Sequence, residues 1–224
     1  MPFDSRTFKT RSLTAVIFVA VMLSALFWNQ WSFAFIFLVI HFGCWQEFVK
    51  LLKKIYPENY GSRTLLGLLY ITLPMGLLIY MRMAHGWTPD DRSLLIVPCG
   101  IIFSIWINDT MAYIVGSLIG KTPFSPISPK KTWEGTLGGA VLCVVVISLA
   151  GKWAGLYRVQ DWVVIASCCA VFGTLGDLLE SKLKRMAQVK DSGSLMPGHG
   201  GFLDRFDSIL IATPFVALYY FWFM

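Results

Sequence analysis

The sequence predicts an all-α integral membrane protein, built as a polytopic bundle of about seven transmembrane helices. Hydrophobic residues make up 56% of its 224 residues and charged residues only 14%, whereas about a quarter of the residues in a soluble domain are charged. Seven apolar runs are long enough, or nearly so, to cross ~30 Å of hydrocarbon, which takes roughly 20 helical residues. They lie at about 12–29, 31–49, 64–82, 94–119, 136–151, 162–180 and 208–224.

We interpret these runs as helices because hydrocarbon offers the backbone no hydrogen-bond partners, whereas a helix pairs its own N–H and C=O groups. The first run follows a basic N-terminus, as in a signal peptide, but no small-residue cleavage site follows it. The second run begins almost at once after Asn29 and Gln30. We therefore expect a retained helical hairpin at the start of the chain.

The lysines and arginines orient the predicted bundle. With the N-terminus inside, 15 of the 19 basic residues fall on one side of the membrane and only Arg82, Arg92, Lys152 and Arg158 on the other. Because cytoplasmic loops carry the excess of lysine and arginine, we expect the crowded side to be the cytoplasmic face of the cell (inner) membrane. The net charge of +6 then needs no nucleic acid as a partner, because anionic lipid headgroups are sufficient.

The first polar element is Asn108-Asp109, inside the predicted fourth span. An aspartate at membrane depth costs about 2.5–3.5 kcal/mol on insertion scales, so it normally faces a polar interior and has a partner. A structural hydrogen bond between helices is the simpler explanation. Two adjacent polar side chains exceed what packing requires, so we favour a functional site that includes Asn108 and Asp109.

The second polar element is the loop Lys121–Glu134. Its three prolines prevent a regular helix and stiffen the loop. At the start of the fifth span it would hold in place Lys130, Lys131, Thr132 and Glu134. Lysines beside a helix N-terminus form a ready anion site, although flanking lysines also anchor membrane helices to headgroups. We favour phosphate binding, and we expect Gly135 and Gly139 to serve helix packing.

The third polar element, residues 177–207, is the most informative part of the chain. Its cations, which can hold phosphates, are Lys182, Lys184, Arg185, Lys190 and Arg205. Hard divalent cations such as Mg²⁺ prefer carboxylate oxygens and usually share them with substrate phosphates. A helix cap or dipole partner explains one aspartate, but it does not explain three. We therefore predict that Asp177, Asp204 and Asp207 bind metal.

The same element contains a glycine-rich turn, residues 197–201, between its carboxylates. Gly200 and Gly201 expose their backbone, so a phosphate can approach the amide groups closely. His199 is either a general base or a donor to phosphate. We favour the donor role, because a phosphate monoester with a second pKa near ~6 arrives ionised and needs no base. On a helix, Asp177, Glu180, Ser181 and Lys184 share one face.

These residues resemble the signature of the phosphatidate cytidylyltransferases (CDP-diacylglycerol synthases). The signature positions that match are Ser181, Lys184, Arg185, Lys190, Asp191, Pro197, His199, Gly200, Gly201, Asp204, Arg205 and Asp207. Gly176-Asp177, Glu180, Asn108-Asp109 and the SPKKTWEG stretch from Ser128 to Gly135 resemble the family too. The resemblance covers roughly the C-terminal half, from about residue 104, and the N-terminal half matches only as hydrophobic spans.

The resemblance implies a nucleotidyltransferase that converts CTP and phosphatidate into CDP-diacylglycerol and pyrophosphate, with Mg²⁺ as cofactor and a monovalent cation such as K⁺ assisting. It implies a homodimer and a single membrane domain, with N-terminal helices in about residues 1–100 and a catalytic region in about 101–224. The implied catalytic residues are Asp177, Asp204, Asp207, Lys184 and Arg185. The implied substrate-binding residues are Asn108, Asp109, Lys130, Lys131, Thr132, Glu134, Ser181, Lys190, His199, Gly200, Gly201 and Arg205.

Two other functions remain open at this stage. A CTP-transferase that acts on another lipid phosphate, such as an unsaturated archaeal ether lipid, would need the same charged residues. A transporter or ion channel is the alternative from another class, since Asn108-Asp109 could line a pathway. The gathering of the carboxylates at one face, together with the lack of an inverted repeat in the sequence, argues against transport.

Overall fold

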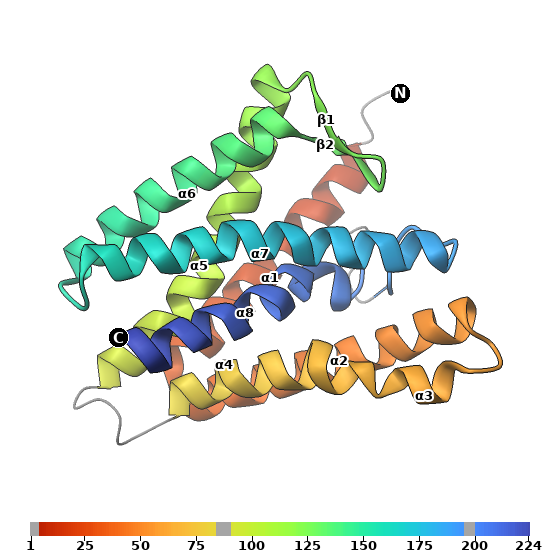
Figure 1. Ribbon diagram of the computed structural model, residues 1–224, viewed down its shortest axis with the longest axis horizontal. Coiled ribbons are helices and arrows are strands. Elements are labelled where there is room, and N and C mark those ends of the chain that lie inside the picture. The colour runs from red at the N-terminus through yellow and green to blue at the C-terminus, as the bar shows by residue number, and fades with distance from the viewer. Residues whose placement is uncertain (1–4, 84–90, 195–199) are drawn as a thin grey trace. The chain divides into compact units, whose positions relative to one another are not determined.

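The computed structural model describes residues 5–83, 91–194 and 200–224, without the side chains of residues 5–13 and 91–93. Most of these residues are helical (Figure 1). In chain order the elements are α1 (Ser5–Trp28), α2 (Gln30–Ile55), α3 (Tyr60–Thr64), the π-helical segment η1 (Leu68–Thr72), α4 (Leu73–Met83), α5 (Asp91–Ile119), β1 (Pro123–Ser125), β2 (Ser128–Thr132), α6 (Trp133–Ala154), α7 (Val159–Met186) and α8 (Leu203–Phe223).

The helices confirm the prediction of an α-helical membrane protein. Among the residues with described side chains, six helical stretches are long and apolar enough to cross a bilayer. The described side chains of α1 form a shorter apolar stretch, Thr14–Trp28, so the seventh crossing stays a prediction. The helical stretches begin before the predicted apolar runs, and several also end beyond them, because polar residues continue the same backbone hydrogen bonding.

The proline-rich loop after α5 forms a small β-hairpin, which the sequence did not predict. Strand β1 pairs antiparallel with β2, with Pro123 opposite Thr132 and Ser125 opposite Ser128. Figure 1 shows this hairpin at one end of the α5–α6 pair. The prolines exclude helix, as expected, but a hairpin this short tolerates them because edge strands need few backbone N–H donors.

The described chain divides into two compact units. One comprises Met1–Met75 with Leu183–Phe206, and the other comprises Gly76–Lys182 with Asp207–Met224. We call them the first and the second unit. Helices α7 and α8 each contribute residues to both units.

The first unit is organised around α2. Asn29 caps this helix, because its side chain accepts a hydrogen bond from the Ser32 amide at 2.8 Å while the Ser32 hydroxyl accepts from the Asn29 amide. Such reciprocal caps satisfy amides that a helix start otherwise leaves without partners. The aromatic core includes Phe37, whose ring lies 6.3 Å from that of Phe206, and both are fully buried.

The second unit depends on close packing of α5 against α6 through glycines. A Cβ added at Gly139 would lie 2.7 Å from the Ala112 amide nitrogen, and one at Gly135 would lie 2.7 Å from the Ala112 carbonyl oxygen. Neither position therefore has room for a side chain. This geometry confirms the packing role predicted for the two glycines.

Gly139→Ala is expected to lower stability, although alanine favours a helix over glycine by roughly 1 kcal/mol. The new methyl group overlaps the backbone of α5, and overpacking of this kind costs about 1–3 kcal/mol. Thermal unfolding in detergent, followed by circular dichroism, measures the effect. Gly76→Ala is the matched control, because a Cβ there meets nothing within 4 Å and should leave the midpoint unchanged or slightly higher. Equal midpoints for the two variants would contradict the packing argument.

Candidate active site

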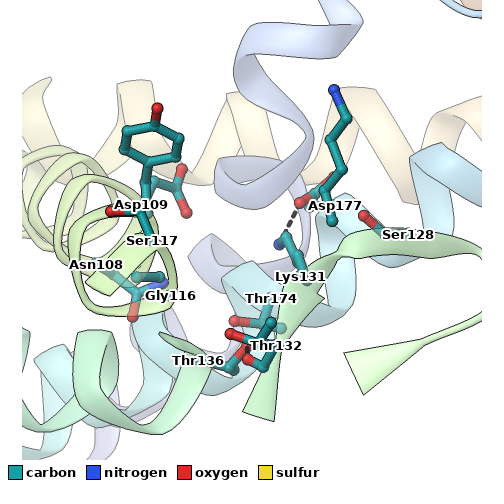
Figure 2. A pocket seen from close by; sticks show the side chains of 13 residues that line it. Asn108, Asp109, Gly116, Ser117, Ser128, Lys131, Thr132, Thr136, Thr174 and Asp177 are labelled. Carbon is teal, nitrogen blue, oxygen red and sulfur yellow. Dashed lines mark hydrogen bonds and ion pairs between the residues drawn. The ribbon is translucent and has the colours of Figure 1, made fainter. Parts of the chain in front are cut away.

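A polar pocket of about 410 Å³ lies in the second unit, lined by residues of α5, β2, α6 and α7. Predicted site residues on its wall are Asn108, Asp109, Lys130, Lys131, Thr132 and Asp177. Apart from Lys130, their side chains are labelled around the pocket in Figure 2, together with hydroxyl groups from Ser117, Ser128, Thr136 and Thr174. Of the residues that supply these hydroxyls, the sequence singled out only Ser128, as part of the stretch Ser128–Gly135, because isolated serines and threonines carry no pattern that distinguishes them from packing residues.

An ion pair joins two walls of this pocket. Lys131, on β2, pairs through its ammonium group with the carboxylate of Asp177, on α7, as the dashed line in Figure 2 marks. Both side chains are about a quarter exposed, at 26% and 28%. A cation and a carboxylate held together at an open surface can receive a phosphate and a metal ion at the same place.

Thr132 links the hairpin to the helix that follows. It is the N-cap of α6, and its hydroxyl accepts a hydrogen bond from the Gly135 amide at 3.1 Å. A Cβ added at Gly116, on α5, would lie 3.1 Å from this hydroxyl, so the glycine lets the cap sit close to α5. The cap fixes the end of β2 and with it the neighbouring Lys131.

Glu134 holds the start of the hairpin. Its carboxylate accepts hydrogen bonds from the Thr122 hydroxyl at 2.8 Å and from the amides of Thr122 and Lys121 at 3.2 Å. The sequence assigned Glu134 to substrate binding. The structure places it as a brace between α6 and the chain entering β1, so we assign it a supporting role for the loop that carries Lys131.

A group of three carboxylates lies in the second unit beside the pocket. Asp177, Glu180 and Asp207 each offer an oxygen, and these oxygens lie within 4.8 Å of one another. Glu180 and Asp207 are buried, at 0% and 7% exposed. Their close approach depends on Gly176, because a Cβ there would overlap the Asp207 carbonyl oxygen. We call this set the carboxylate cluster.

The charges around the cluster favour a cation. Burial and then the neighbouring carboxylates of Asp177 and Asp109 disfavour a negative charge on Asp207, while Lys131 offsets part of that repulsion. Carboxylate oxygens are the ligands that Mg²⁺ prefers, and it commonly shares them with substrate phosphates. The donor set therefore fits a hard divalent ion. The i, i+3 spacing of Asp177 and Glu180 placed both on one helix face, but that spacing did not show that Glu180, and not Asp204, joins the cluster.

Asn108 is buried on the pocket wall, at 4% exposed. Its side-chain oxygen has no hydrogen-bond partner among the described residues. Asp109 follows it and also lines the pocket. The structure therefore brings the polar pair of the fourth predicted span together with Lys131 and Asp177, as the sequence led us to expect.

Lys184 and Asp204 belong to the first unit, where they form a second ion pair. The Lys184 ammonium nitrogen lies 2.6 Å from Asp204 Oδ1. Asp204 Oδ2 also accepts hydrogen bonds from the amides of Ser192 and Gly201, at 2.9 and 2.8 Å. The Asp204 carboxylate is thus engaged by protein donors. Gly200, at φ +83°, supplies a left-handed turn that only glycine adopts easily.

The remaining predicted residues lie outside the carboxylate cluster and the Lys184–Asp204 pair, or outside the described residues. Ser181 donates a hydrogen bond from its hydroxyl to Asp177 Oδ1 at 3.3 Å. The remaining predicted cations, Lys182, Arg185, Lys190 and Arg205, are exposed. His199 falls outside the described residues, so its donor role stays a prediction.

The chain matches known proteins over most of its length. Residues 56–223 match the cytidylyltransferase family. Phosphatidate cytidylyltransferase of Bacillus subtilis is 47% identical over 144 residues, which cover 62% of this chain and 54% of the relative. The enzyme of the same name from Haemophilus influenzae is 33% identical over 198 residues, 82% of this chain and 68% of the relative. Phosphatidate cytidylyltransferase 5, chloroplastic, of Arabidopsis thaliana is 45% identical over 141 residues, 61% of this chain and 34% of the relative.

The fold and the site together define a multi-helix membrane protein with a polar pocket in which a lysine is paired with a carboxylate. With the matched residues, they show that this chain belongs to the cytidylyltransferase family. The matched region spans 34% to 68% of the length of these three curated relatives.

Proposed function

We propose that this protein transfers the cytidylyl group of CTP to phosphatidate, giving CDP-diacylglycerol and pyrophosphate. The observation that carries the proposal is the Lys131–Asp177 pair on the pocket wall, next to the carboxylate cluster. Two polyanionic substrates react only when cations screen their charge. The relatives that the chain matches are named phosphatidate cytidylyltransferases, which supports phosphatidate as the acceptor.

We assign Mg²⁺ to the carboxylate cluster, with Asp177, Glu180 and Asp207 as its protein ligands. When bound, the ion would neutralise phosphate charge and make the α-phosphorus of CTP more electrophilic. The sequence also assigned Asp204 to metal, and its engagement with Lys184 and Ser192 supports a different role, the positioning of those groups. Assistance from a monovalent cation such as K⁺ remains part of the proposal.

The residues of the chain act by position and charge in this reaction. An oxygen of the phosphatidate phosphate attacks the α-phosphorus of CTP in line, the bond to the β-phosphate breaks, and pyrophosphate leaves. Lys131 and Lys130 contribute positive charge where the triphosphate enters, and Thr132 holds β2 in place. Asn108 offers a buried polar group to the nucleotide. No protein base is required, because the attacking phosphate is already ionised.

The site must lie at the depth of the lipid headgroups. Withdrawing phosphatidate from the bilayer costs ~0.8 kcal/mol for each buried CH₂, so the phosphate has to react where it lies. We propose seven crossings, a cytoplasmic N-terminus, a site on the cytoplasmic side of the cell membrane, and a homodimer. The excess of basic residues on the predicted cytoplasmic side supports this orientation.

Single cysteines test the orientation. In a cysteine-free background, Ser125→Cys in the β-hairpin and Ser194→Cys are expected to react with impermeant thiol reagents only in inside-out vesicles. Lys152→Cys, at the other end of α6, is the control and should react only from the opposite side. Labelling of Ser125→Cys or Ser194→Cys from the outer side would overturn the proposed topology.

An assay of the purified protein tests the function itself. CTP-dependent release of pyrophosphate with phosphatidate in mixed micelles, together with formation of CDP-diacylglycerol, is the expected result. An ether-linked lipid phosphate is the comparison substrate. Turnover of that lipid with none of phosphatidate would identify a related transferase with another acceptor, and no release with either lipid would overturn the proposal.

A further inference from the structure

Glu47 is a buried carboxylate on α2, outside the half of the chain that carries the predicted site. It is 6% exposed and lies within a helix long and apolar enough to span a membrane. An ionisable side chain in a membrane segment is costly, and it normally marks a functional site with a specific partner. Its partners therefore indicate what it does.

The partners of Glu47 come from the segment that leads into α8. Glu47 accepts hydrogen bonds from the Ser192 hydroxyl at 2.7 Å, the Phe202 amide at 3.0 Å and the Leu203 amide at 2.8 Å. The Leu203 amide is the first of α8 and the Phe202 amide directly precedes it, at the point where a helix leaves its first N–H groups without internal partners. Glu47, which belongs to α2, thus caps the N-terminus of α8. It also holds Ser192, which lies ten residues before Phe202 in the chain.

Three glycines leave room for this contact, all within the first unit. A Cβ added at Gly193 or Gly201 would overlap the Glu47 carboxylate. One turn before Glu47, a Cβ at Gly43 would overlap the ring of Phe202. The face of α2 around Glu47 therefore packs closely against Gly193, Gly201 and Phe202, and the contact is not an accidental surface pairing.

The contact extends to the predicted catalytic lysine. The Ser192 hydroxyl also lies 2.8 Å from Asp204 Oδ2, and Asp204 Oδ1 holds the Lys184 ammonium group at 2.6 Å. A hydroxyl has one proton to donate, so Ser192 serves one of the two carboxylates at a time, while its amide remains on Asp204. Glu47, Ser192, Asp204 and Lys184 form one connected network.

We infer that Glu47 is a positioning residue for the transferase reaction: it fixes Ser192 and the start of α8 and, through Ser192 and Asp204, the Lys184 ammonium group. This inference rests on the proposed function. Glu47 itself touches neither substrate in this account. Its effect on catalysis comes from the precision with which it places other groups, and misplacement of about 1 Å can cost ~10²-fold in rate.

Glu47→Gln tests the inference with little change in size. Oε1 accepts from the Phe202 amide, and Oε2 accepts from the Leu203 amide and Ser192. Either orientation of glutamine therefore turns an NH₂ group against a backbone N–H. We expect kcat per folded molecule to fall at least about tenfold, with a smaller change in KM for CTP. Glu47→Asp, which keeps the charge and both acceptors, should recover part of the loss.

Two measurements separate positioning from a purely structural role. Thermal unfolding reports the folded fraction, and hydrogen exchange of peptides covering 187–206 reports the local order of the segment. Glu58→Gln, at an exposed glutamate of the same unit, is the matched control and should leave kcat and exchange unchanged. We expect faster exchange in 187–206 for Glu47→Gln, with exchange elsewhere as in the parent.

The outcomes are distinct. A folded Glu47→Gln protein with kcat within twofold of the parent overturns the inference, as does a kcat loss that Glu47→Asp does not lessen. If Glu47→Gln does not fold, Ser192→Ala provides the test, and parental kcat in that variant overturns the inference equally. A parent that makes no CDP-diacylglycerol refutes the proposed function instead. The exchange measurement still shows in that case whether Glu47 anchors the segment.

Discussion

Asp177→Asn and Asp207→Asn are each expected to lower turnover at least ~10²-fold, comparable to the loss of one preorganised stabiliser of the transition state. Asparagine keeps the shape and much of the hydrogen bonding of aspartate but removes the charge. A cluster whose oxygens lie within 4.8 Å of one another would then hold Mg²⁺ poorly. The double variant should be little worse than either single one, because the two residues disable one unit.

Initial rates of CDP-diacylglycerol formation across a Mg²⁺ titration measure this effect. The weakened site should show as a higher Mg²⁺ requirement as well as a lower maximal rate. Asp191→Asn, at an exposed position, is the matched substitution and should cost much less. Near-parental rates with unchanged Mg²⁺ dependence in Asp207→Asn would rule out ligation by the cluster.

Asp204→Asn, added to the same series, decides between two roles for that residue. The sequence predicted a metal ligand, whereas the structure pairs its carboxylate with Lys184 and the Ser192 amide. If Asp204 positions those groups, the variant loses rate without a change in Mg²⁺ requirement. A raised Mg²⁺ requirement equal to that of Asp177→Asn would restore the ligand assignment.

Lys131→Ala is expected to lower kcat/KM for CTP at least about tenfold, the second-largest effect that we predict. Its ammonium group lies at Asp177 on the pocket wall, where an incoming triphosphate would meet it, and hydrogen bonds between charged groups are worth about 1.5–3 kcal/mol. A CTP titration at saturating phosphatidate measures the loss. Lys131→Arg should retain part of the activity, since arginine keeps the positive charge but spreads it over a planar guanidinium group.

The competing explanation for Lys131 is anchoring of the hairpin to lipid headgroups. Lys121→Ala is the matched control, because Lys121 flanks the same hairpin and is exposed but does not line the pocket. Anchoring predicts equal and small effects for both lysines, seen mainly in membrane insertion. Phosphate binding predicts a loss confined to Lys131→Ala with insertion intact.

Composition and residue spacing predicted much of this protein. Apolar runs located the helices because hydrocarbon permits few other backbone conformations. Helices α5 and α7 contain the runs predicted at 94–119 and 162–180, and α8 covers the run predicted at 208–224 except for its last residue. The prolines of the loop correctly excluded helix. They did not reveal the pairing of β1 with β2, because two strands of three and five residues carry too little pattern.

The site was predicted where its residues are neighbours along the chain. Asn108-Asp109, Lys130-Lys131-Thr132 and Asp177 were each visible as polar residues in apolar surroundings, and the structure brings them to one pocket. The sequence did not show that the third member of the carboxylate cluster is Glu180 and not Asp204. Which carboxylate joins a cluster depends on side-chain direction and on the packing of α7 against α8 at Gly176. Residue spacing alone predicts neither the direction nor the packing.

The sequence by itself determined the class of protein, the helices and the chemical types in the site, because hydrophobic length and charge are local properties of the chain. Only the tertiary structure decided which charges meet. Glu47 and Ser192 are 145 residues apart. In the sequence, α2 is an apolar span with one glutamate, and nothing in it indicates this contact. Such a contact forms because a buried carboxylate and the free amides at a helix start each need a partner, and folding alone brings the two together.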